Sequence, residues 1–112
     1  MLDRLAAIEA RYSDLSERLS SPEIAKRPSQ LQRLAREAGD LKQTVEASGR
    51  YRQALARREE AQQIIDAGED DELVELATAE LEELVPEVEG IEAELRVLLV
   101  PKDPSDNRNA IV

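Results

Sequence analysis

The sequence predicts an all-α protein in which an antiparallel helical hairpin packs against a shorter third helix, as a coiled-coil-like three-helix bundle. Three stretches carry apolar residues at alternating steps of three and four, the spacing that places a narrow apolar stripe along a helix. The 112 residues include no Phe, Trp or His and only two Tyr. A core would therefore consist of Leu, Ile, Val and Ala, which suits helix-on-helix layers.

The first predicted helix covers about residues 2–20. After it, Ser21 as N-cap and Pro22 at the first helical position predict a short helical turn that continues through Ile24. The stripe of this helix consists of Leu5, Ile8, Tyr12, Leu15 and Leu19.

The second predicted helix covers about residues 29–66, with Ser29 as its expected N-cap. Gly39 and Gly49 weaken it by about 1 kcal/mol each relative to alanine. We expect one continuous helix, because no proline interrupts the stretch and the apolar stripe resumes beyond Gly49. The alternative is two helices that are broken at Gly49. Ser48 lies at a stripe position.

The third predicted helix covers about residues 70–99 and follows a short turn that contains Gly68, a residue suited to the left-handed end of a helix. Asp70 is its expected N-cap. Pro86 lies inside the stripe and predicts a kink, and Pro101 stops the helix. Because the connecting turn is short, the second and third helices should pack antiparallel.

Net charge is −10, and the acidic excess belongs to one segment. Residues 1–65 carry 12 basic and 10 acidic side chains, whereas residues 66–95 carry 13 acidic side chains and no Lys or Arg. Nucleic-acid phosphates bind Lys and Arg and repel carboxylates. A surface for nucleic acid is therefore expected within residues 1–65.

Reactive side chains are scarce. The chain has no Cys and no His, which excludes disulfides, thiolate ligands, Cys nucleophiles and His-based acid–base catalysis. Carboxylates of the third helix could form a cation site, but they alternate with apolar residues as on a solvated helix face. We therefore expect no catalytic residue, no metal site, no cofactor and no enzyme activity in this chain. The carboxylates in question are Glu82, Glu83, Glu87, Glu89, Glu92 and Glu94.

Arginines of the second helix allow two interpretations. They could form an RNA-facing surface, for which the candidates are Arg50, Arg52, Arg57 and Arg58, or they could balance the acidic third helix. Tyr51 could stack on a base, or it could pack between helices with its hydroxyl in water. Arg33 and Arg36 belong to the same set of arginines.

The residues alone leave three kinds of protein open. They are a positioning arm of a larger machine, a free-standing RNA- or tRNA-binding helical hairpin, and an oligomerising coiled coil. The N-terminus has no apolar run of signal-peptide or membrane-spanning length, which predicts a soluble cytoplasmic protein without a membrane partner.

The end of the sequence carries a more specific pattern. Residues 98–104 (Leu-Leu-Val-Pro-Lys-Asp-Pro), with Asp106, Arg108 and residues 109–112, resemble the junction between the first two domains of bacterial peptide chain release factors of the type that reads UAA and UAG. Residues 1–5, 19–23 and 72–80 also resemble the helical N-terminal domain of this family. The junction motif itself consists of Pro101, Lys102, Asp103 and Pro104.

The resemblance implies a fragment of a translation termination factor: residues 1–100 as the helical N-terminal domain, and residues 101–112 as a linker and the start of a strand of a second domain. The whole protein of this family reads the codon with a Pro-x-Thr motif and promotes peptidyl-tRNA hydrolysis with a Gly-Gly-Gln motif, neither of which occurs here. Only Pro86 and Gly90 depart from the smooth charged helix of relatives.

The resemblance also implies partners for the helical domain. It would act as a positioning arm that contacts the large-subunit stalk base and the GTPase-associated region of the ribosome, and it would respond to the recycling translational GTPase. It implies a monomer in the full protein, whereas the fragment could self-associate through apolar surface that its parent covers.

Overall fold

A computed structural model describes residues 1–100, and the predicted all-α bundle is confirmed. These residues form four helices: α1 (Leu2–Leu19), α2 (Pro22–Ala25), α3 (Pro28–Ala67) and α4 (Asp71–Leu98). The bounds of the three long helices differ by no more than one residue from those expected. The linker and strand predicted for 101–112, with the junction motif, lie outside the described residues.

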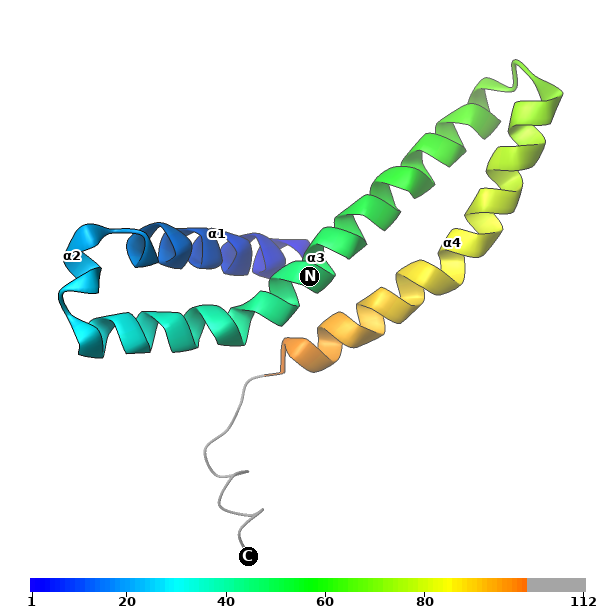
Figure 1. Cartoon of the computed structure of the whole chain (residues 1–112). Coiled ribbons are helices and arrows are strands. Elements are labelled where there is room, and N and C mark those ends of the chain that lie inside the picture. The colour runs from blue at the N-terminus through cyan, green and yellow to red at the C-terminus, as the bar shows by residue number, and fades with distance from the viewer. Residues whose placement is uncertain (101–112) are drawn as a thin grey trace, which may run out of the picture.

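Helices α3 and α4 form an antiparallel hairpin, as the short connection predicts (Figure 1). Gly68 follows α3 with φ 59°, the left-handed conformation for which glycine has no steric penalty. The Asp70 carboxylate accepts a hydrogen bond from the Glu72 backbone N–H at 3.0 Å, so Asp70 is the N-cap of α4. The hairpin turn is therefore specified by its own residues.

Helix α3 is continuous through Gly49, and the alternative of two helices is not found. Figure 1 shows that α3 changes direction near its middle, so that its first part runs beside α1 and its second part beside α4. The expected N-cap was wrong: Arg27 precedes the helix and Pro28 occupies its start, which places Ser29 inside the first turn. Proline is favoured there because the first helical N–H has no intrahelical acceptor.

Helix α4 is unbroken through Pro86, although proline removes one backbone donor from the helix. In Figure 1, α4 changes direction near its middle, in yellow, which is where the sequence predicts a kink. The remaining turns of α4 keep its apolar stripe in contact with α3.

One buried cluster lies where α1, α3 and α4 meet. Leu5 comes from α1, and its side chain is fully buried. Small residues contributed by α3 let the backbones approach closely, and large aliphatic residues of α4 fill the space. The other members are Ala47, Tyr51 and Ala54 of α3, and Leu84, Val88, Ile91 and Leu95 of α4.

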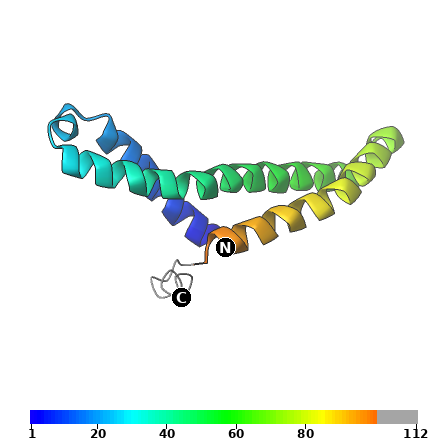
Figure 2. The ribbon, with the colours of Figure 1, turned by 60° about the horizontal axis from the view of Figure 1, so that its bottom comes forward.

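The molecule is elongated and thin (Figure 2). Its principal extents are 61 × 43 × 18 Å, and its radius of gyration is 19.9 Å, against about 13 Å for a compact domain of similar length. The two ends of this shape are the α2 corner, where the chain turns from α1 into α3, and the hairpin tip between α3 and α4. The α2 corner and the hairpin tip therefore lie far apart.

Candidate functional site

Two of the candidate arginines bridge the hairpin. Arg50 Nη2 lies 2.8 Å from Glu94 Oε1 on α4, and this hydrogen bond lowers the pKa of the Glu94 carboxyl. Arg57 Nε lies 3.2 Å from Glu80 Oε1, and Arg57 Nη1 lies 3.5 Å from Glu87 Oε2. These pairs have the geometry of the second interpretation, in which arginines balance the acidic helix. These pairs are exposed to solvent, so each contributes little to stability.

Arg52 joins α3 to α1 instead. Its guanidinium donates two hydrogen bonds to the Glu9 carboxylate, from Nη2 at 2.8 Å and from Nε at 3.0 Å, in the bidentate geometry that arginine favours. The fully buried Ser48 hydroxyl donates to the same carboxylate. Hydrogen bonds from Arg52 and then from Ser48 lower the pKa of the Glu9 carboxyl. We call Glu9, Ser48 and Arg52 the α1 clasp.

Tyr51 packs between the helices, with only 6% of its surface exposed. Its hydroxyl donates a hydrogen bond to Glu92 Oε2 at 2.8 Å, where the sequence suggested water as the partner. The carboxylate stabilises the protonated phenol, and together with burial this raises the pKa of Tyr51. A Tyr51 ring in this position is not available to stack on a base.

Arg58 is the exposed member of a row of otherwise buried positions along α3, which we call the α3 seam. Buried side chains of α3 recur at steps of three and four when position 58 is included, but Arg58 itself is exposed and makes no ion pair with residues 1–100. It lines a surface groove with Leu81 and Val85 of α4. The buried positions that define the seam are Thr44, Ala47, Tyr51, Ala54 and Ala61.

Replacing Arg58 with leucine is expected to raise the free energy of unfolding by about 1 kcal/mol, because a leucine at this seam position would bury apolar surface against Leu81 and Val85. Urea denaturation followed by circular dichroism would measure the change. Glu60→Leu, an exposed position off the seam, is the control. An equal gain in both variants would contradict the assignment of position 58 to the seam.

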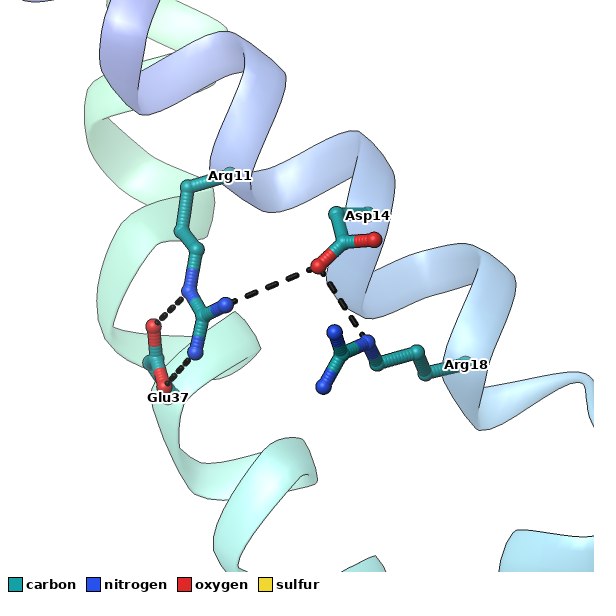
Figure 3. Close-up of polar contacts among 4 residues, drawn as sticks. All are labelled: Arg11, Asp14, Arg18 and Glu37. Carbon is teal, nitrogen blue, oxygen red and sulfur yellow. Dashed lines mark hydrogen bonds and ion pairs between the residues drawn. The ribbon is translucent and has the colours of Figure 1, made fainter.

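A second polar network fixes α1 along the first part of α3 (Figure 3). Arg11 donates to both Glu37 oxygens, with Nη2 2.9 Å from Oε1, and this bond lowers the pKa of the Glu37 carboxyl. Asp14 lies between two arginines of α1. Its Oδ2 atom is 3.5 Å from Arg11 Nη1 and 3.2 Å from Arg18 Nε. Sequence spacing did not reveal the pairing of Arg11 with Glu37, because these residues are brought together only by packing.

The start of α1 lies against the end of α4. Arg4 Nη2 donates a hydrogen bond to the Leu99 backbone carbonyl at 2.9 Å, one of the carbonyls that have no partner at a helix end. This contact places the N-terminus of α1 beside the point where the described chain ends.

Within residues 1–100, no three His, Cys, Asp or Glu side chains are grouped so that they could bind a metal ion. None of the helices in this range has the combination of length and apolar character that a membrane span requires.

The fold and its contacts define an elongated coiled-coil-like module whose helices are joined by arginine–carboxylate pairs. The chain belongs to the PCRF domain family, which matches residues 8–112. Proteins called peptide chain release factor 1 are similar to it over its whole length, with 41% identity in Bacillus licheniformis, 38% in Bacillus subtilis and 41% in Syntrophus aciditrophicus. The resemblance to bacterial release factors is thereby confirmed.

The alignments cover 100% of this chain but only 32%, 32% and 31% of these three relatives. The chain therefore spans about a third of their length. No solved structure matches it significantly.

Proposed function

We propose that this chain is the helical positioning arm of a cytoplasmic translation termination factor that directs peptide release at UAA and UAG. The observation that carries the proposal is the similarity to peptide chain release factor 1 over all 112 residues. The chain contains neither a Pro-x-Thr nor a Gly-Gly-Gln motif, so its part in release would be binding and orientation rather than codon reading or hydrolysis.

The shape supports such a role. Two long helices joined along a 61 Å molecule form a projection that can reach a distant partner. In the proposed complex, the arm contacts the large-subunit stalk base and the GTPase-associated region, and it responds to the recycling translational GTPase. On the hairpin, Arg50, Arg52, Arg57 and Arg58 remain our predicted RNA-facing residues. Three of them keep side chains that are 44–53% exposed while paired.

A chimera tests the proposal. Residues 1–112 would replace the matching segment of the Bacillus licheniformis release factor, and binding to ribosomes programmed with UAA, UAG or UGA would be measured. The chimera is expected to bind at UAA and UAG within about tenfold of the parent, a difference of about 1.4 kcal/mol. The parent factor without this segment is expected to bind more weakly.

Two comparisons make the result decisive. A chimera that binds no better than the shortened factor would contradict the proposal, and a concentration-dependent dimer of the chain in sedimentation would then favour the oligomerising coiled coil. Arg58→Glu in the chimera tests the hairpin candidates, because this change breaks no ion pair within residues 1–100.

A further inference from the structure

The α2 corner carries a local excess of positive charge that the net charge of the whole chain conceals. Residues 24–36 include four basic side chains and no acidic one. They lie on the end of α2, on the connection to α3 and on the first turns of α3, at the opposite end of the molecule from the acidic hairpin tip (Figure 1). We call Lys26, Arg27, Arg33 and Arg36 the basic corner.

The basic corner is not neutralised by neighbouring carboxylates. All four side chains are exposed, and none forms an ion pair within residues 1–100, whereas the arginines of the hairpin and of α1 are mostly paired. Acidic side chains on the adjoining elements include Glu17, Glu23, Glu37 and Asp40, and none of them forms an ion pair with the basic corner within residues 1–100. Glu37 is already held by Arg11 (Figure 3).

Hydrogen-bonding groups surround these cations. Two shallow surface hollows adjoin each other and share Arg33. The first turn of α3 contains no acidic residue and has no side-chain cap, so its backbone N–H groups add partial positive charge. The first hollow is lined by Arg18, Ile24, Gln30, Arg33 and Leu34, and the second by Ser29, Gln32, Arg33 and Arg36.

The composition of the corner favours nucleic acid over protein. The core of a protein interface is apolar and depleted in charge, but no large hydrophobic side chain between residues 18 and 36 is strongly exposed. Those that are exposed lie at the hairpin and where α1 meets the end of α4. Unpaired Arg and Lys with hydroxyl and amide groups between them match the phosphates of a nucleic-acid backbone.

We propose that the basic corner binds the phosphate backbone of RNA. This inference rests on the proposed function, in which the partner is the ribosome, and the ribosome contains RNA. The carboxylates of residues 66–95 would be repelled by the same RNA, so the molecule would bind with its α2 corner toward RNA and its hairpin tip away from it.

The test uses the full 112-residue chain and two probes: protein-free ribosomal RNA, and polyglutamate as an acidic peptide. Arg33→Glu/Arg36→Glu is expected to weaken RNA binding about tenfold at about 50 mM salt, and to reduce the slope of log affinity against log salt by about two. The matched control is Lys42→Glu/Arg96→Glu, which changes net charge equally at exposed sites outside the corner. All four positions are exposed, so helicity by circular dichroism should be unchanged.

Each outcome has a distinct meaning. Equal weakening by both double variants would overturn the proposal, because overall charge alone would then explain binding. Binding of polyglutamate but not of RNA would assign the corner to an acidic protein and would also overturn it. If the chimeric factor binds ribosomes while the chain binds no RNA, this inference fails and the proposed function stands. The reverse result would retain the RNA site and reject the arm.

Discussion

Leu5→Ala is expected to lower the free energy of unfolding by about 2–5 kcal/mol, the usual range for a truncated core leucine. The Leu5 side chain is fully buried and belongs to the cluster that includes Tyr51 of α3 and Leu95 of α4. Its removal would leave a cavity at the point where three helices meet. Long helices on either side cannot close that cavity without moving the whole of α1.

Leu2→Ala provides the matched control, because Leu2 lies one turn earlier on α1 and is 42% exposed. Equilibrium denaturation in urea, followed by helicity, would compare both variants with the parent chain. If Leu5→Ala costs no more than Leu2→Ala, α1 is not docked on the hairpin as the structure has it.

The helices, and the antiparallel pairing of the second with the third, could be predicted because the information is local. Steps of three and four place the stripe of each helix, and Gly68 with Asp70 specifies the hairpin turn. Even the continuity of α3 through Gly49 follows, since a single glycine costs only about 1 kcal/mol against a long packed face. Ser29 failed as an N-cap because Pro28 already occupies the first helical position.

The ion-pair partners of the charged side chains could not all be predicted in the same way. A basic second helix beside an acidic third one predicts pairs such as Arg50 with Glu94, and these are found. Arg52 is only two residues from Arg50, yet it faces α1, because a step of two along a helix turns a side chain toward a different neighbour. Which helix lies on that side is decided by packing. The stripe position of Ser48 was the sole local sign of the clasp.

Glu9→Ala is expected to destabilise the chain by about 1–3 kcal/mol, the cost of leaving a buried polar group without its partner. The fully buried Ser48 hydroxyl donates to Glu9, so removal of the carboxylate leaves this donor unsatisfied and Arg52 unpaired. Denaturation of Glu9→Ala, Ser48→Ala and the double variant would measure the coupling. Glu9→Ala should cost less in the Ser48→Ala background, where no buried hydroxyl is left unsatisfied. Strict additivity would contradict the clasp.

The clasp should also depend on pH in one direction. Folding lowers the pKa of the Glu9 carboxyl below its ordinary value of 4.5, so the folded state favours the carboxylate and the unfolded state binds the proton more readily. The contribution of Glu9 is therefore complete at neutral pH and is lost as pH falls below 4.5 through the folded pKa. Glu37 and Glu94 shift in the same direction, which is why Glu9→Gln is the necessary comparison. The stability difference between the parent and Glu9→Gln should shrink as pH is lowered from neutral through 4.5 and below, and a constant difference would mean that the Glu9 charge does not hold α1 in place.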